Sequence, residues 1–182
     1  MNGEVSWDAA KPTPVSGTDY HFVSERDIDY LVSKGCTCVR LIFSWEQVQP
    51  VLKKPLALDS EYYKNFKKVV DYCIGKGPQL SVVIEIHGGE NKNFIRYKGN
   101  VVGSTAVTNA SFGDFWKRMA NEWKFTQQVI FGLSNEPHDV STVKWFAAAN
   151  AAIKGIRSTG AMNTILVSGN GYSNAMGWFD TW

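Results

Sequence analysis

Two hydrophobic patterns take turns along this chain. Almost continuously apolar runs occur at 38–43, 80–86, 129–133 and 164–167. Before and between these runs, apolar residues recur every three or four positions over 25–34, 60–75, 112–123 and 141–160. Short, β-branched apolar runs predict strands, whereas the three-to-four spacing predicts amphipathic helices. The chain is therefore predicted to alternate strand and helix.

The predicted helices also carry local signals at their starts and on their faces. Ser24 with Asp27 three residues later resembles a capping box, and either Asp59 or Ser60 is suited to cap the second helix. The residues predicted to face inward in the fourth helix are Phe146, Ala149, Ile153 and Ile156.

The strand pattern indicates the fold class. Strands that are apolar throughout are covered on both faces, which is typical of a parallel sheet built from βα units. We expect an α/β fold with four such strands in a single domain over residues 1–182. A complete eight-unit barrel takes about 250 residues, so the domain is expected to be an incomplete barrel.

Composition narrows the choice of function. The formal charge of +2 and the lack of a Lys/Arg run predict no nucleic-acid partner, and no apolar stretch reaches membrane-spanning length. The start at Met1–Val5 shows no secretory signal. Cys36, Cys38 and Cys73 are expected to be buried, unbridged thiols.

Polar residues stand where the predicted strands end. Arg40 lies within the first, His87 follows the second, Asn135-Glu136 follows the third and Asn170 follows the fourth. Each residue alone has an ordinary structural explanation, such as an ion pair or a loop hydrogen bond. On a barrel, however, all these strand ends gather at one face, where catalytic groups collect.

Other chemistries fit the sequence less well. His21, His87 and His138 lack metal-ligand spacing, and there is no Gly-x-Ser-x-Gly elbow for a serine hydrolase. The segment 169–174 is a partial dinucleotide fingerprint without its third Gly. We therefore expect no metal and no cofactor.

Five segments together resemble glycoside hydrolase family 5, the cellulase family of retaining (β/α)8 endoglucanases. They are 35–50 with Arg40, 84–87 ending in His87, 93–104, 129–139 with Asn135-Glu136-Pro137, and 151–170. The resemblance implies a partial TIM barrel, comprising about strands two to five. It also implies hydrolysis of internal β-1,4-glucosidic bonds in cellulose or a related β-glucan.

The resemblance implies catalytic roles for four residues. Glu136 would be the general acid/base, and Asn135 would bind the sugar 2-hydroxyl. Arg40 would orient the nucleophilic carboxylate, and His87 would contact the sugar in the cleavage subsite. The residues expected to bind substrate are Asn93, Tyr97, His138, Asn170, Tyr172 and Trp178. Core packing is an almost equally good explanation for Tyr172 and Trp178.

The chain also departs from the family pattern. Residues 88–92 lengthen the loop after His87. By resemblance, the first strand would lie before residue 1, and the nucleophilic Glu of the seventh strand would lie past Trp182. Glu85 is expected to lie deep in the sheet, Glu90 in the inserted loop, and Glu46 beside a base, so none is a good substitute.

We therefore expect impaired hydrolysis from this chain alone. The alternatives are a non-catalytic carbohydrate-binding half barrel and an inactive gene fragment. The expected partner is a polysaccharide, with self-association through exposed barrel edges. An extracellular location is implied by the family resemblance and an insoluble substrate.

Overall fold

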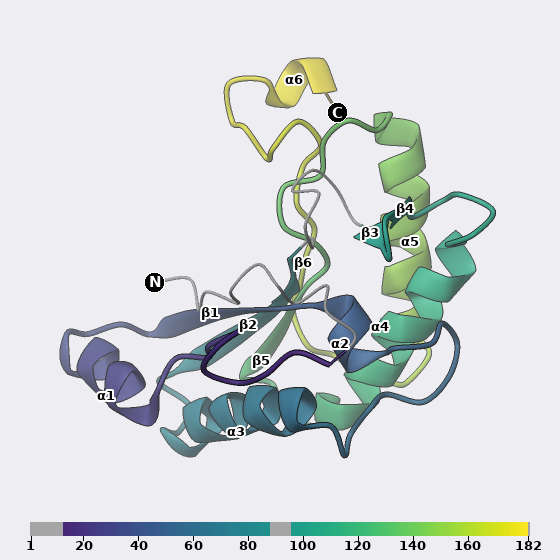
Figure 1. The fold of residues 1–182 in the computed structure, drawn as a ribbon. Helices are drawn as coiled ribbons and strands as arrows, with labels where there is room; N and C mark the ends of the chain where they lie inside the picture. Colours follow the sequence, from purple (N-terminus) through teal and green to yellow (C-terminus); the bar gives the residue numbers. More distant parts are fainter. Residues whose placement is uncertain (1–12, 88–95, 182) are drawn as a thin grey trace.

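The computed structural model describes residues 13–87 and 96–181, and its main elements follow the predicted alternation (Figure 1). The strands of the main sheet are β1 (Cys38–Phe43), β2 (Ser81–Ile86), β5 (Val129–Gly132) and β6 (Ile165–Leu166). The long helices are α1 (Glu25–Ser33), α3 (Glu61–Gly75), α4 (Asn109–Trp123) and α5 (Thr142–Arg157). The shorter elements are α2 (Trp45–Val48), β3 (Arg96–Tyr97), β4 (Asn100–Val101) and α6 (Trp178–Thr181). The four predicted strands and four predicted helices are confirmed, and the shorter elements are additional.

The main sheet is parallel, with its strands in the order β1-β2-β5-β6. Each strand of the main sheet thus lies beside the strand that precedes or follows it along the chain. At least one helix lies between each two consecutive strands. The hairpin of β3 and β4 is a separate antiparallel pair. The carboxyl ends of all four parallel strands consequently lie along one edge of the sheet.

One face of the sheet packs against the long helices. On β1 this face carries Leu41 and Phe43, which are fully buried. The ring of Phe43 lies 5.0 Å from that of Phe66 on α3, and the ring of Phe131 on β5 lies 6.0 Å from that of Trp116 on α4. Figure 1 shows α3 running beneath β1 and β2. Because successive side chains alternate between faces, Arg40 points to the opposite side.

The helix starts follow the predicted caps. Ser24 and Asp27 form a reciprocal capping box at α1, and Ser60 rather than Asp59 caps α3 by accepting the backbone N–H of Tyr63 at 3.1 Å. Capping satisfies backbone N–H groups that have no partner within the helix. The predicted starts of both helices are thus explained by single side chains.

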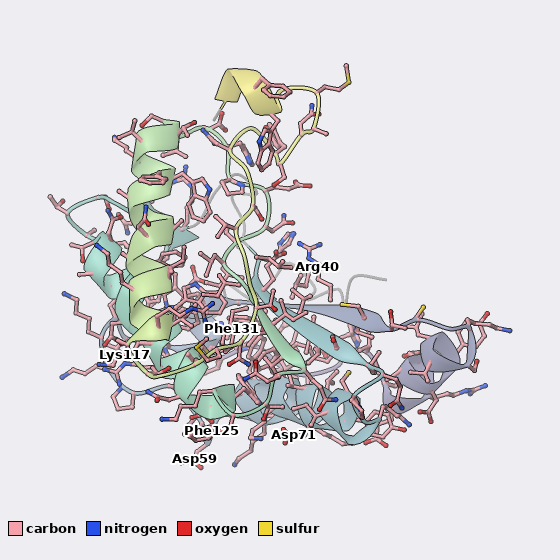
Figure 2. All side chains as sticks on the ribbon, turned by 180° about the vertical axis from the view of Figure 1, so that it is seen from behind. Arg40, Asp59, Asp71, Lys117, Phe125 and Phe131 are labelled. Carbon is pink, nitrogen blue, oxygen red and sulfur yellow. The ribbon has the colours of Figure 1, made fainter. Side chains whose placement is uncertain are left out.

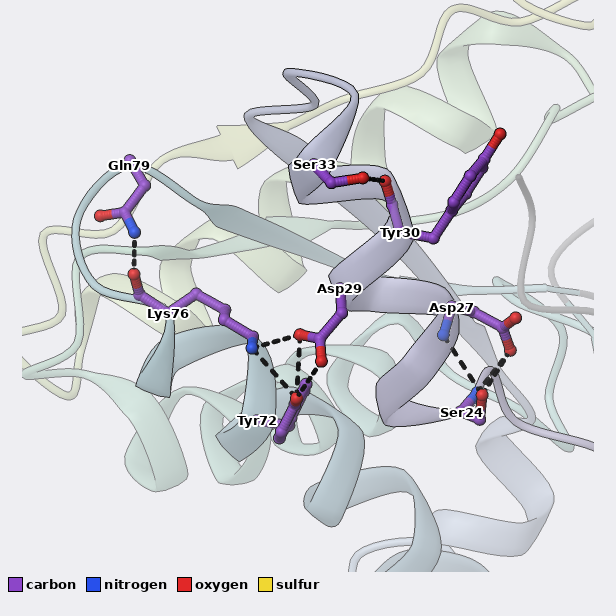
Figure 3. Close-up of polar contacts among 8 residues, drawn as sticks. All are labelled: Ser24, Asp27, Asp29, Tyr30, Ser33, Tyr72, Lys76 and Gln79. Atoms are coloured by element: carbon purple, nitrogen blue, oxygen red, sulfur yellow. Dashed lines mark hydrogen bonds and ion pairs between the residues drawn. The ribbon is translucent and has the colours of Figure 1, made fainter.

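A polar network joins α1 to α3 (Figure 3). Asp29 of α1 forms an ion pair with Lys76, just after α3, and accepts the hydroxyl of Tyr72 at 2.9 Å. The ammonium of Lys76 also lies 4.3 Å from the centre of the Tyr72 ring. These contacts link the two helices on the protein surface, away from the carboxyl edge of the sheet.

Two glycines allow α4 and α5 to pack side by side (Figure 1). A Cβ atom at Gly155 would overlap the carbonyl oxygen of Gly113, and a Cβ atom at Gly113 would lie 2.7 Å from the carbonyl oxygen of Ala151. This close contact buries the alanine side of α5, so the prediction that Phe146 faces inward is wrong. Phe146 is 57% exposed, and the preceding residue, Trp145, is fully buried.

The three cysteines are free thiols, as predicted, but they are not all buried. Cys73 is buried within α3, Cys36 is half-buried, and Cys38 is exposed. The expectation of a buried Cys38 is wrong because it begins β1, which is an outer strand of the sheet. Within 13–87 and 96–181, no helix has both the length and the apolar character needed to cross a membrane.

Candidate active site

Side chains from three neighbouring chain segments meet at the carboxyl edge of the sheet. Arg40 lies on β1, Glu85 lies on β2, and Asn135 follows β5. Arg40 donates from Nε to Glu85 Oε2 at 2.7 Å, and from Nη2 to that same oxygen. Nη2 also donates to Asn135 Oδ1 at 2.6 Å. Figure 2 shows Arg40 on the opposite side of the sheet from Asp71 of α3. We call Arg40, Glu85 and Asn135 the arginine cluster.

The arginine cluster determines how the amide of Asn135 is turned. A guanidinium has only donors, so the atom that faces Arg40 is the carbonyl oxygen Oδ1. The NH2 group of Asn135 then points away from Arg40. The backbone N–H of Asn135 donates to the Ile86 carbonyl at 2.9 Å, which holds this segment against β2. Asn135 is therefore oriented to donate a hydrogen bond to a ligand.

Glu136 combines an exposed side chain with an unusual backbone. Its φ is 35°, in the left-handed region that side chains with a Cβ rarely adopt. The buried ring of His138 places Nδ1 2.6 Å from the Glu136 carbonyl oxygen. Since a carbonyl only accepts, Nδ1 carries the proton. This hydrogen bond stabilises the strained backbone and leaves the carboxylate in solvent.

Glu85 is the buried carboxyl group of the arginine cluster and is only 6% exposed. Burial raises its pKa above the ordinary value of 4.5, while the charge and hydrogen bonds of Arg40 lower it. The negative charge of Glu136 raises the pKa of Glu85 further. Glu85 and Glu136 therefore interact electrostatically at the edge of the sheet.

His87 is also brought to this edge. Its backbone N–H donates to the Phe43 carbonyl at 3.0 Å, which places the half-buried His87 beyond the carboxyl ends of β1 and β2. The predicted reshaped loop, together with Glu90 and Asn93, lies outside the described residues.

The chain after β6 packs onto the Glu136 segment through Tyr172. The ring of Tyr172 stacks on His138 with 3.9 Å between centroids and 17° between planes. The backbone N–H of Tyr172 donates to the Pro137 carbonyl at 3.1 Å. Because Tyr172 is 55% exposed, the ring presents surface to solvent beside Glu136.

Asn170 lies behind this surface and is 8% exposed. Its amide nitrogen donates to the Val140 carbonyl at 2.8 Å and to the Thr142 hydroxyl at 3.1 Å. These bonds tie the chain after β6 to the start of α5. His138 and Asn170, both predicted to bind substrate, are thus placed where they support the residues at the surface.

The two remaining aromatic candidates are placed differently. Tyr97 is 5% exposed, its hydroxyl donates to the Gln49 carbonyl at 2.8 Å, and its ring lies 5.0 Å from that of Trp45. Burial raises the pKa of Tyr97 to about 12. Trp178 begins α6 and is 41% exposed. The structure places Tyr97 in the core rather than with the arginine cluster.

One expectation about glutamates is corrected. Glu85 is buried on β2, in line with the expectation that it lies deep in the sheet, and its carboxylate contacts Arg40 directly. Glu46, expected beside a base, accepts the backbone N–H of Lys98 at 2.9 Å and the hydroxyl of Ser44 at 3.1 Å. Strand alternation places Glu85 on the face of β2 that Arg40 occupies on β1, but the register that brings them together is not visible in the sequence.

Within the described parts of the chain, no group of three or more His, Cys, Asp or Glu residues is arranged to hold a metal ion. The polar edge consists instead of an exposed carboxylate next to a paired arginine and asparagine. At the carboxyl edge of a parallel α/β sheet, this arrangement is typical of a (β/α)8 barrel enzyme that uses carboxylate chemistry.

The chain belongs to the cellulase family, glycosyl hydrolase family 5, whose model matches residues 5–178. The resemblance seen in the sequence and the predicted partial (β/α)8 architecture are confirmed.

Relatives of known structure and sequence cover this chain almost completely. An endo-β-1,4-glucanase from Xanthomonas axonopodis pv. citri is 34% identical, with a TM-score of 0.88 over 100% of this chain. XacCel5A, whose structure is known in complex with cellopentaose, is 34% identical in sequence, with a TM-score of 0.87 over 98% of this chain. Endoglucanase 1 of Robillarda sp. (strain Y-20) is 32% identical over 97% of this chain.

This chain spans about half the length of these three proteins. It covers 55% of the Xanthomonas chain, 54% of XacCel5A and 50% of Endoglucanase 1.

Proposed function

We propose that this chain supplies the acid/base part of an endo-β-1,4-glucanase site, with Glu136 as the catalytic acid/base. The observation that carries the proposal is the exposed Glu136 carboxylate immediately beside Asn135, which Arg40 holds at 2.6 Å. An acid/base must reach solvent and the leaving oxygen, whereas its neighbours must be fixed. The edge of the sheet provides both conditions.

In the proposed reaction, Glu136 protonates the glycosidic oxygen as the bond to the anomeric carbon breaks, and later removes a proton from the attacking water. Asn135 donates from its NH2 group to the sugar 2-hydroxyl, a contact that strengthens in the transition state. Arg40 would also orient the nucleophilic carboxylate and favour its ionised form.

Retention of configuration requires a second carboxyl group about 5–5.5 Å from the first. Glu85 is poorly suited to that role because Arg40 Nε and Nη2 both donate to its Oε2 and because the residue is buried. We therefore propose that the 182-residue chain alone hydrolyses β-glucan weakly or not at all.

The substrate-binding surface would include His87, Tyr172 and Trp178, which are at least partly exposed. Tyr172 is the best placed to stack on a pyranose ring because His138 holds it beside Glu136. His138 and Asn170 would support this surface through their contacts with the Glu136 carbonyl, the Tyr172 ring and the start of α5. Asn93 is kept as a proposed substrate contact on the family resemblance alone. We leave the buried Tyr97 out of the proposed surface.

The proposed substrate is cellulose or a related β-glucan, and the cellopentaose complex of XacCel5A supports a polymer of glucose units. A polymer that does not enter cells can be hydrolysed only outside them. We therefore propose that the protein acts extracellularly.

The test uses the chain itself, Glu136→Gln, and Asp139→Asn as a matched control. Asp139 is also an exposed carboxylate with a positive φ, three residues further on. Reducing-sugar release from carboxymethyl cellulose is measured first, and we expect little or none. An aryl β-cellobioside is then supplied with sodium azide, an anion able to attack the anomeric carbon in place of a nucleophilic carboxylate.

With azide, the parent and Asp139→Asn should form α-cellobiosyl azide. Glu136→Gln should form much less, because the departing oxygen has lost its proton donor. Equal rates in the parent and Glu136→Gln would refute the acid/base role. Hydrolysis of the polymer without azide would refute the proposed weakness of the chain alone and make Glu85 the next residue to test.

The same samples separate the two alternatives. Cellopentaose binding without turnover under any condition would favour a carbohydrate-binding half barrel, which the exposed ring of Tyr172 also suits. The absence of a cooperative thermal transition would favour an inactive fragment.

A further inference from the structure

Glu85 is a buried carboxyl group that no step of the proposed reaction uses. It is 6% exposed, yet it accepts two N–H groups of Arg40, one of them at 2.7 Å. The Arg40 side chain is 34% exposed, so the pair is only partly buried. Withdrawing the Glu85 carboxylate from water offsets much of the attraction, and such a pair is weak evidence of stabilisation. A buried carboxylate at the edge of a candidate site therefore needs another explanation.

The neighbouring strand is built to accommodate this side chain. Gly132 of β5 is the register partner of Glu85 on β2. A Cβ atom at Gly132 would lie 2.8 Å from Glu85 Oε1 and 3.0 Å from Glu85 Cβ. The side chain of Glu85 thus occupies the space that a larger residue at 132 would fill, on its way to Arg40.

Arg40 transmits this arrangement to Asn135. Its Nη2 donates to both Glu85 Oε2 and Asn135 Oδ1, the latter at 2.6 Å. The guanidinium is planar, so fixing Nε and Nη2 on Glu85 fixes the direction in which Nη2 meets the amide. If Arg40 turned away, this hydrogen bond would no longer fix on which side of the Asn135 amide the oxygen lies and on which side the NH2 group lies.

We infer that Glu85 is a positioning residue of the site: it holds Arg40 so that Arg40 turns the Asn135 NH2 group toward the sugar 2-hydroxyl. The inference rests on the proposed function for the identity of the ligand. It assigns Gly132 the role of making room for Glu85.

The test compares the parent chain, Glu85→Gln and a matched control, Glu122→Gln. Glu122 is also a hydrogen-bonded glutamate, since it accepts the Tyr63 hydroxyl at 3.1 Å, but it lies on α4. Two readouts are taken: the NMR resonances of Arg40 Nε–H and of the Asn135 side-chain NH2 group, and cellopentaose affinity by calorimetry. Parent spectra are also recorded as a function of pH.

Glu85→Gln should shift both resonances and weaken cellopentaose binding about five- to tenfold, which is the loss of affinity expected when one well-placed hydrogen bond is lost. Glu122→Gln should change neither readout. In the parent, the Arg40 and Asn135 resonances should follow one shared titration that is absent from Glu85→Gln. If Glu85 had only a structural role, the Asn135 resonance would not change with pH together with the Arg40 resonance.

Unchanged Asn135 resonances or unchanged affinity in Glu85→Gln would overturn the inference. If Glu85→Gln does not fold, independent titrations of Arg40 and Asn135 in the parent would overturn it equally. If the parent itself does not bind cellopentaose, the proposed function fails, while the two resonances still decide whether Glu85 orients Asn135 through Arg40.

Discussion

The contact between α4 and α5 allows one substitution to be worked through in detail. In Gly155→Ala, the new Cβ would overlap the Gly113 carbonyl oxygen and lie 2.9 Å from its carbonyl carbon. These are backbone atoms of a regular helix, so they cannot rotate aside as a side chain does. The substitution therefore forces α5 away from α4.

The expected cost is the balance of two opposing effects. Alanine in a helix interior is favoured over glycine by about 0.8–1.0 kcal/mol. Overpacking costs about 1–3 kcal/mol, and more where the backbone must move. Separating the helices also loosens the fully buried Phe112, Trp116, Ala148 and Ala152. Because the overlap is with backbone, the overpacking cost is expected to reach about 3–4 kcal/mol, so the net loss is about 2–3 kcal/mol. This lowers the Tm by about 4–12 °C for a domain of this size.

The assay is thermal unfolding followed by circular dichroism, with Gly75→Ala as the control. Gly75 is also helical, on α3, but a Cβ there would meet nothing within 4 Å. The control receives only the helix-forming advantage of alanine, so its Tm should stay the same or rise by up to about 4 °C.

A Gly155→Ala protein that melts at or above the parent temperature would refute the close contact between the helices. Gly113→Ala provides a second check, since its Cβ would lie 2.7 Å from the Ala151 carbonyl oxygen. It should also lower the Tm.

Three further predictions concern the sheet. Gly132→Ala should lower the free energy of unfolding by about 1–2 kcal/mol in urea titrations, because its Cβ would lie 3.0 Å from Glu85 Cγ. Glu85 should make stability pH-dependent. Its pKa is raised on folding, so the folded state holds the proton to higher pH, and the contribution to stability is lost as pH rises from 4.5 through the folded pKa. The Tm of the parent minus that of Glu85→Gln should therefore fall across that window. Leu166, 44% exposed on the outer strand β6, should promote self-association, and Leu166→Lys should reduce the mass seen by analytical ultracentrifugation.

Each of these has a contrary result. A Gly132→Ala chain as stable as the parent would mean that Glu85 moves without cost. A Tm difference between parent and Glu85→Gln that rises with pH would mean that folding lowers the pKa of Glu85 instead of raising it. A monomeric parent at all concentrations would exclude association through β6.

Much of the fold was predictable because its signals are local. The apolar runs matched the four parallel strands, and Ser24 and Ser60 marked helix starts through contacts within three residues. The hairpin of β3 and β4 was missed because each strand has only two residues. The positive φ at Lys98 and Gly99 shows a tight turn that the Lys-Gly pair could have signalled.

The errors arose where distant segments decide the outcome. Phe146 was predicted to be buried from helical spacing alone, but the approach of α4 turns the small residues of α5 inward. Arg40, Asn135 and Glu136 stand at strand ends in the sequence itself, whereas the role of Glu85 depends on a contact with Arg40 that spans 45 residues of sequence. Hydrophobic periodicity contains no information about strand register.

The space shared by Glu85 and Gly132 also has an evolutionary consequence. Because a Cβ at 132 would lie 2.8–3.0 Å from the side chain at 85, a change at either position affects the other. A lineage that shortened residue 85 would relieve position 132 of its contacts with the outer part of that side chain, although the 3.0 Å contact with the Cβ atom would remain, and one that enlarged residue 132 first would press residue 85 away from Arg40. The two positions should therefore covary among descendants of this chain, although they lie on different strands and one of them has no side chain.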